Sequence, residues 1–298
     1  ENVRRSSRRL SPSSRRGMET ATAPPPKKRS EAEILRSLLE NGVAKRFDLV
    51  AWANAGCRQP TPIERLLHLF EQCRPDVAKL IVLEELEGTP EEDADVLVYG
   101  EIDTVEFTEL LNKYGGVNAL GGGGGDDGGR VFYDLGSGTG KAVCAAGLCA
   151  HFRHVRGVEI LPCTAAIASV LVEDFVRDVL PGSRPAGNAL VSVDVERGDF
   201  FAREHLERWR RADLVFCNCV TWDDDTMTTL SRHAEGLRPG AVFITVLCPL
   251  ASDAFELVEE VELKFSWGSV EALVHRRLTD EQAAAAAALG AAMEAMEG

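Results

Sequence analysis

The stretch VFYDLGSGTGKAV at residues 131–143 constrains the fold most, because three glycines in five residues follow β-forming side chains. A strand that ends in such a turn and leads into a helix lets a ligand approach the backbone closely. The triphosphate-binding pattern is broken because Ala142 follows Lys141, and the dinucleotide pattern would need glycine at position 141. The carboxylate of Asp134 would repel a pyrophosphate. The residues therefore favour a positively charged ligand, and S-adenosylmethionine carries both an ammonium and a sulfonium.

Strands and helices alternate after residue 129, which indicates a mainly parallel sheet covered by helices. The expected strands are 130–135, 155–160, 190–196, 212–217, 241–247, 261–267 and 270–278, the last two joined by a tight Gly-Ser turn. This pattern predicts an α/β fold of the class I methyltransferase (Rossmann-like) type. The seven-stranded, mainly parallel sheet would end in a β-hairpin and follow a small all-helical region.

Two further acids end the next two expected strands. Glu159 lies 19 residues after Gly140, where a carboxylate can bind ribose hydroxyls. Asp199 has Phe200 beside it, and this pair suits the amino group and the ring of adenine. Alone, Asp134 could cap the next helix and Asp199 could open a turn. Together, three acids at the carboxyl ends of consecutive strands predict a methyltransferase core.

The residues after the fourth strand, FCNCVTWDDD, should shape the site of the methyl acceptor. Amino methyltransferases that act on DNA adenine or on glutamine carry Asn/Asp-Pro-Pro-aromatic there, and this chain has no Pro-Pro. Asn218 still provides a neutral amide, with the aromatic Trp222 four residues later. We expect Asn218 to fix the geometry of cofactor and acceptor, and Trp222 to wall the acceptor channel. A strand-end turn packed by an aromatic ring is the structural alternative.

Composition divides the chain into four regions. Residues 1–30 are a basic arm of disordered type, residues 31–95 have helical apolar spacing, residues 96–279 form the core, and residues 280–298 form an alanine-rich terminal helix. The glycine-rich stretch 120–129 is expected to be a surface spacer. The arm is either a solvated tail, or a predicted leader before Met18, or a phosphate-contacting segment whose PPPKKR is a nuclear import signal.

Charge is distributed unevenly along the chain, whose net charge is −14. Residues 1–36 carry ten Lys/Arg against four Asp/Glu, while the remainder carries 23 against 43. The acidic body should not bind nucleic acid, whereas the arm could. The eight cysteines lack metal-ligand spacing, so we expect reduced thiols and no metal. No apolar run reaches the roughly 20 residues of a bilayer span, so no membrane partner is expected.

At this point the chain resembles the disruptor-of-telomeric-silencing family, the non-SET histone lysine methyltransferases. The resemblance covers about residues 96–275. It is carried by VYGE (98–101), DLGSGTG (134–140), GVE (157–159), ERGDF (196–200), VFCN (215–218), PL (249–250) and VELKFSWG (261–268). It implies methyl transfer from S-adenosylmethionine to a lysine in the folded core of histone H3 on nucleosomes, and hence a nuclear protein.

The site residues expected from the motifs and the resemblance fall into two sets. Asn218, Trp222 and Tyr99 are the expected catalytic residues, with Tyr99 and Glu101 closing over the methionine end. The expected cofactor-binding residues are Tyr99, Gly100, Glu101, Asp134, Leu135, Gly136, Ser137, Gly138, Thr139, Gly140, Lys141, Glu159, Asp199, Phe200 and Asn218.

The chain departs from the family pattern mainly in the acceptor loop. The family's second asparagine is Cys219, its Phe-Ala-Phe is Val-Thr-Trp at 220–222, its Gly-Pro becomes three aspartates at 223–225, and its threonine after YGE is Ile102. Two alternatives therefore stay open: a lysine methyltransferase for a non-histone protein, and an inactive S-adenosylmethionine-binding chromatin adaptor.

Overall fold

The computed structural model describes residues 60–87, 99–116, 128–185, 188, 190 and 192–297. The predicted basic arm, the first half of the predicted helical region, most of the glycine-rich spacer and Val98 of the VYGE motif lie outside the described residues.

A seven-stranded sheet with the order β3-β2-β1-β4-β5-β7-β6 forms the centre of the molecule. The parallel strands are β1 (Arg130–Leu135), β2 (Phe152–Glu159), β3 (Ser192–Arg197), β4 (Leu214–Cys217) and β5 (Val242–Val246). The antiparallel hairpin consists of β6 (Phe255–Phe265) and β7 (Gly268–Arg277), and β7 pairs with β5. This confirms the predicted class I methyltransferase sheet and its terminal hairpin.

The predicted boundaries differ most at β6, which begins at Phe255 and not at residue 261. The missed stretch contains several glutamates, which argue against a buried strand. β6 is an edge strand, in which Glu256, Glu260 and Glu262 are exposed while Phe255, Leu263 and Phe265 are buried. A register shift between Leu257 and Glu259 further breaks the alternation on which the prediction relied.

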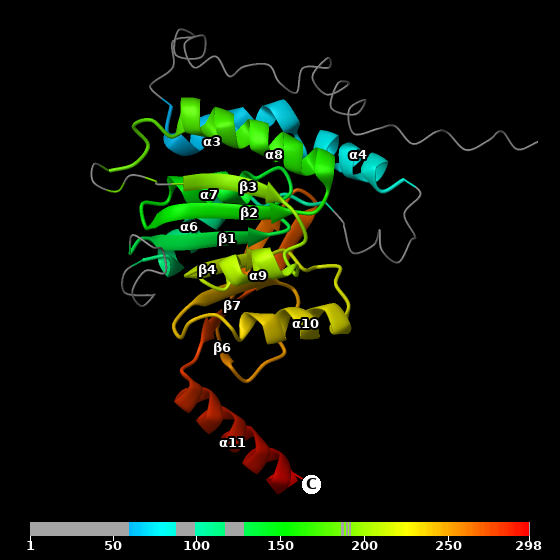
Figure 1. The fold of residues 1–298 in the computed structure, drawn as a ribbon, viewed down its shortest axis with the longest axis vertical. Coiled ribbons are helices and arrows are strands. Elements are labelled where there is room, and N and C mark those ends of the chain that lie inside the picture. The colour runs from blue at the N-terminus through cyan, green and yellow to red at the C-terminus, as the bar shows by residue number, and fades with distance from the viewer. Residues whose placement is uncertain are drawn as a thin grey trace, which may run out of the picture.

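Helices cover both faces of the sheet (Figure 1). One face carries α6 (Thr104–Tyr114), α7 (Lys141–Leu148) and α8 (Pro162–Asp174), which share a buried core with Phe132, Phe152 and Ile244. The other face carries α9 (Arg203–Trp209) and α10 (Asp224–Ala234), packed over Tyr133 and Phe243. Both faces are therefore dry, which leaves the carboxyl ends of the parallel strands as the open edge for a ligand.

Short helices before the core confirm the helical region expected there. These are α3 (Pro62–Phe70), the 3-10 turn η1 (Glu71–Cys73) and α4 (Pro75–Glu85). The start of α3 at Thr61 is a complete capping box, because the Thr61 and Glu64 side chains each bind the other residue's backbone N–H. In the fold, α3 contacts α7 and α4 contacts α8, so these helices form an outer layer (Figure 1).

Beyond the core, α8 continues into a π-helical turn, η3 (Phe175–Val179), and the chain ends in α11 (Asp280–Glu297), which extends away from the body (Figure 1). None of the described helices combines the length and the apolar character that a bilayer span requires. All seven described cysteines are free thiols, and six of them are buried; Cys57 lies outside the described residues.

Candidate functional site

The glycine-rich turn between β1 and α7 is built on left-handed backbone. Gly136, Gly138 and Gly140 have φ values of 80°, 54° and 82°. Residues with a Cβ are strained at such backbone angles, whereas glycine is not. Gly140 itself is the N-cap of α7, and no side chain caps that helix. The alternative that Asp134 serves as the helix cap is therefore excluded.

Two buried carboxylates lie at the ends of the neighbouring strands β1 and β2. Asp134 is 3% exposed and Glu159 is 6% exposed. The backbone N–H groups of Gly138 and Leu161 donate to Glu159 over 2.7 and 2.8 Å, so that carboxylate is held between the glycine turn and the start of α8. Burial raises the pKa of Asp134 well above its ordinary value, and the charge of Glu159 raises it further. A cation in the cavity would relieve this repulsion.

The third acid, Asp199, lies beside an aromatic cluster after β3. One of its oxygens accepts a hydrogen bond from the Phe201 N–H at 2.8 Å, so the turn-forming role considered for it is real. The residue also lines the cavity, together with Phe200 and Trp222. The Phe200 and Trp222 rings are stacked at 5.7 Å between centroids and 14° between planes. Trp222 thus packs on the ring expected to contact adenine.

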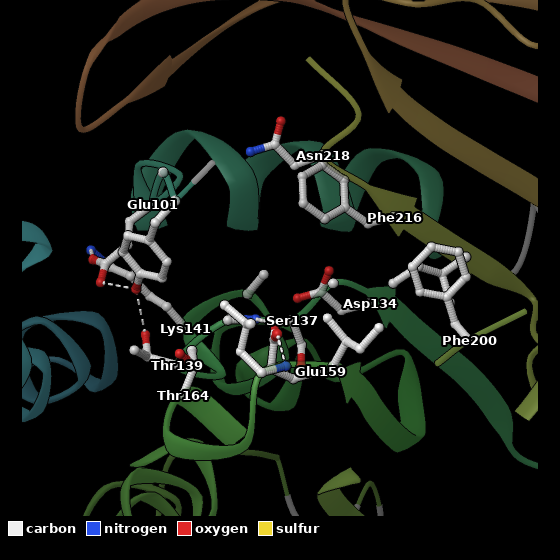
Figure 2. A pocket seen from close by; sticks show the side chains of 18 of the residues that line it. Glu101, Asp134, Ser137, Thr139, Lys141, Glu159, Thr164, Phe200, Phe216 and Asn218 are labelled. Carbon is white, nitrogen blue, oxygen red and sulfur yellow. Dashed lines mark hydrogen bonds and ion pairs between the residues drawn. The ribbon is translucent and has the colours of Figure 1, made fainter. Parts of the chain in front are cut away.

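A hydrogen-bonded network closes the opposite end of the cavity (Figure 2). The Tyr99 hydroxyl donates to Glu101 at 2.6 Å and lies 2.9 Å from the Thr139 hydroxyl. The Lys141 ammonium donates to the other Glu101 oxygen at 2.9 Å. Since Lys141 begins α7 and Glu101 precedes α6, this ion pair joins the segment 99–102 to the glycine-rich turn.

The segment 99–102 is also held from the hairpin side. The Glu101 N–H donates to the Ser266 hydroxyl at 3.1 Å, and the Ser266 N–H donates to the Glu101 carbonyl at 2.7 Å. A Cβ on Gly100 would lie 2.2 Å from Nε1 of Trp267, so only glycine allows this close approach. The expected position of residues 99–101 over the cavity follows from these contacts.

Asn218 follows β4 and lines the same cavity. Its side-chain oxygen Oδ1 is buried and has no hydrogen-bond partner among the described residues. An unpaired buried amide oxygen costs free energy unless a ligand donates to it. The Ser137 hydroxyl is buried and unpaired in the same way within the described part of the chain. These orphaned groups fit a polar ligand in the cavity.

Figure 2 shows Glu101, Thr139 and Lys141 at one end of the cavity and Phe200 at the other, with Asp134 and Glu159 between them. Of the site residues expected from the sequence, all except Gly140 line the cavity; the lining residues are Val82, Tyr99, Gly100, Glu101, Ile102, Asp134, Leu135, Gly136, Ser137, Gly138, Thr139, Lys141, Ala142, Glu159, Ile160, Leu161, Thr164, Asp199, Phe200, Phe201, Phe216, Asn218, Trp222, Thr226 and Phe265.

Several lining residues were not singled out from the sequence. Phe216 and Phe265 lie inside motifs that were recognised, so their position next to Asn218 and Trp267 in the chain was a usable signal. Val82 belongs to α4 in the helical region, and Thr164 belongs to α8. No local pattern marks these two, because they reach the cavity through helix packing.

The family model described as "Histone methylation protein DOT1" matches residues 96–270, more than half of the chain. A relative from Cryptococcus neoformans (strain JEC21), named as a histone-lysine N-methyltransferase specific for H3 lysine-79, is 34% identical over 132 residues. That match covers 43% of this chain and 19% of the relative, so the chain spans about a fifth of the curated protein. Strain B-3501A has a protein of the same description and identity.

Among solved structures, the rRNA methyltransferase AviRa from Streptomyces viridochromogenes has a TM-score of 0.44 at 15% identity, covering 65% of this chain and 94% of its own. The O-methyltransferase from Bacillus cereus in complex with SAH has a TM-score of 0.40 at 14% identity, covering 73% and 97%. These scores are low, and the fold rests on the strand order itself.

Proposed function

The chain belongs to the DOT1 family of histone methylation proteins, and from this premise we propose that it is a histone-lysine N-methyltransferase. It would transfer a methyl group from S-adenosylmethionine to a lysine in the folded core of histone H3 on nucleosomes. The observation that carries the proposal is the cavity in which Asp134, Glu159 and Asp199 meet the unpaired Oδ1 of Asn218. The family membership supports the histone as acceptor.

The residues of the cavity suit the cofactor group by group. Glu159 already accepts two backbone N–H groups, and its remaining lone pairs can accept the ribose hydroxyls. Asp199 and Phe200 suit the adenine amino group and ring. The stacked contact between Phe200 and Trp222 supports a role for Trp222 beside the adenine, in place of the acceptor channel first expected for it.

The methionine end of the cofactor carries an ammonium and a carboxylate, and the chain offers a partner for each. Asp134 is a buried carboxylate beside the glycine turn, where an ammonium would offset its charge. Lys141 holds its ammonium at the cavity wall and has donors left beyond the one used by Glu101. When bound, the cofactor supplies an electrophilic methyl group for direct displacement.

The acceptor lysine must be neutral to attack, although the ordinary pKa of its amine is about 10.4. Phe216, which lies beside Asn218 in Figure 2, Phe265 and Ile102 give the cavity apolar walls, and such walls disfavour the charged amine. The Asn218 oxygen can accept a hydrogen bond from the amine and orient it. The chain then contributes positioning and desolvation in place of a strong base.

Access to nucleosomes is assigned to the basic arm. Residues 1–36 carry the positive charge that the acidic body lacks, and phosphate contacts provide salt-sensitive affinity. The sequence PPPKKR within this arm supports a nuclear location.

A second candidate is a lysine methyltransferase for a non-histone protein. The observation that favours it is the acceptor loop, where Trp222 and the aspartates 223–225 replace the family's residues. A third candidate is an inactive chromatin adaptor, which the intact cofactor acids disfavour.

One experiment separates the three candidates. The full chain and its Asn218→Ala variant would be given labelled S-adenosylmethionine with nucleosomes, free histones and a cell extract. Label on nucleosomal H3 that disappears in the variant is the expected result. Label only on another protein of the extract would replace the histone by that acceptor. No label, with the cofactor still bound, would favour the adaptor.

A further inference from the structure

Helix α8 begins without a capping side chain of its own. Its N-cap is the apolar Leu161, which makes no side-chain hydrogen bond. The first backbone N–H groups of any helix lack intrahelical partners and need an acceptor. In this chain the acceptor comes from α4, nearly eighty residues earlier. Glu85 accepts from the Cys163 N–H at 2.6 Å and from the Thr164 N–H at 3.1 Å.

The Glu85 carboxylate is bound more firmly than a surface contact would be. The residue is 9% exposed, and the Thr164 hydroxyl donates to it at 2.7 Å as a third hydrogen bond. An anion at a helix N-terminus also interacts favourably with the helix dipole. The helical region therefore fixes the position of the start of α8. This region lies before residues 96–270, which the family model matches.

The segment that Glu85 holds directly follows Glu159, the residue predicted to bind the ribose. Glu159 ends β2, and Leu161, two residues later, donates its N–H to Glu159. Cys163 and Thr164 follow within the same turn and bind Glu85. Two carboxylates thus fix one short stretch of backbone from its two ends. Movement at the start of α8 would move the donor that orients Glu159.

The same helix reaches the cavity directly. Val82 lies one turn before Glu85 on α4 and lines the cavity together with Ile160 and Thr164. Burial raises the pKa of Glu159, and the charge of Glu85 raises it further. The helical region is therefore coupled to this edge of the site by packing, by hydrogen bonds and by charge.

We propose that Glu85 is a positioning residue for the cofactor ribose, which acts through the α8 N-terminus and Glu159. This inference rests on the proposed function, because it takes the cofactor to be S-adenosylmethionine. It makes α4 a part of the cofactor site, so the core of the family match is incomplete without the helical region before it.

The test is calorimetric and does not need catalysis. S-adenosylhomocysteine and its 2′,3′-dideoxyribose analogue would be titrated into the full chain, into Glu85→Ala and into Glu159→Gln. Glu85→Ala should weaken binding of S-adenosylhomocysteine roughly tenfold, the effect of about one lost hydrogen bond to a charged group. The analogue should bind the unaltered chain and the variant with nearly the same affinity. The double variant Glu85→Ala/Glu159→Gln, titrated in the same way, should bind S-adenosylhomocysteine no worse than Glu159→Gln alone, because the two residues act in series.

The matched control is Arg65→Ala, which loosens the helical region at a different place. Arg65 on α3 donates to the Ser183 hydroxyl at 2.6 Å and to the Pro181 carbonyl at 3.3 Å, beyond the far end of α8. This variant should leave both affinities unchanged. An equal loss for both ligands in Glu85→Ala, or a loss in Arg65→Ala of the same size, would overturn the inference.

Three further outcomes are distinguishable. If Glu85→Ala does not fold, Glu85→Gln keeps one acceptor oxygen and should show the same selective loss for the ribose-bearing ligand; an unselective loss overturns the inference. If the unaltered chain binds no S-adenosylhomocysteine, the proposed function fails and the inference falls with it. If it binds and Glu85→Ala binds equally well, only the inference fails.

Discussion

Asp134 and Glu159 end two adjacent parallel strands and bury two carboxylates beside one cavity. Burial raises the pKa of both groups; the charge of Glu159 raises the pKa of Asp134 further, and the charge of Glu85 raises that of Glu159. Two buried acids placed together destabilise the fold unless a cation lies near them, so the arrangement supports a site for a cation.

The burial of Asp134 beside Glu159 predicts that Asp134 lowers the free energy of unfolding by an amount that depends on pH. A carboxyl whose pKa is raised in the folded state stabilises the protein below its unfolded pKa, and this stability is lost as pH rises through the folded pKa. Without cofactor, Asp134→Asn should therefore gain in unfolding free energy relative to the unaltered chain as pH rises above about 4, the ordinary pKa of an aspartate. Urea unfolding at several pH values measures the difference. A difference that does not change with pH would contradict the assignment.

Bound cofactor should favour the stability of the unaltered chain over that of Asp134→Asn. S-adenosylmethionine would offset the ionised Asp134 but gains nothing from the neutral amide. Its addition should raise the melting temperature of the unaltered chain more at high pH than at low pH, and raise that of Asp134→Asn less. Parallel thermal melts with and without the cofactor check this, and equal shifts in both proteins would count against Asp134 as its partner.

The Lys141–Glu101 ion pair should show non-additive energetics. The side chains are 16% and 3% exposed, so removal of Lys141 leaves the buried Glu101 carboxylate without a positive partner, although the Tyr99 hydroxyl still donates to it. Lys141→Met should cost about 3–5 kcal/mol of unfolding free energy, as for other broken buried pairs. The double variant Lys141→Met/Glu101→Gln should be more stable than Lys141→Met alone. Double-mutant cycles of chemical unfolding measure this, and strictly additive changes would show that the pair is not coupled.

Glu159→Gln should weaken S-adenosylmethionine binding by roughly 1.5–3 kcal/mol, the size of a hydrogen bond to a charged group. The amide keeps the shape of the side chain but cannot accept from the Gly138 and Leu161 N–H groups and the ribose together. Isothermal titration gives the affinity, with circular dichroism as the control for folding. Unchanged affinity would remove Glu159 from the cofactor site.

Deletion of residues 1–30 should weaken nucleosome binding and flatten its salt dependence, since each lost phosphate contact reduces the slope of log affinity against log salt by roughly 0.9. Binding titrations at several salt concentrations measure the slope. Affinity for S-adenosylmethionine should stay the same, which controls for damage to the core. An unchanged slope would assign nucleosome affinity to another part of the chain.

Local sequence patterns predicted the glycine-rich turn and the acids at the strand ends. Glycines that need left-handed backbone, acids at strand ends and the alternation of strands and helices are short-range signals. They predicted the sheet and the cavity wall formed by residues 134–139, Lys141, Glu159, Asp199 and Phe200, whereas residues 99–101 were predicted from the family resemblance. The start of β6 was missed because an edge strand tolerates glutamates on its solvent side. The stacking of Trp222 on Phe200 could not be predicted, since it depends on how two loops pack.

The amino-acid sequence alone determined the class of fold, the glycine-rich turn after β1, the three acids at the ends of β1, β2 and β3, and the place of Asn218 after β4. Each is set by residues near one another in the chain, where backbone preference and strand order decide. Only the tertiary structure decided that Glu85 caps α8 and that Lys141 pairs with Glu101. These contacts join residues about 40 and 80 positions apart, and they form because buried donors and charges must find partners wherever packing brings them.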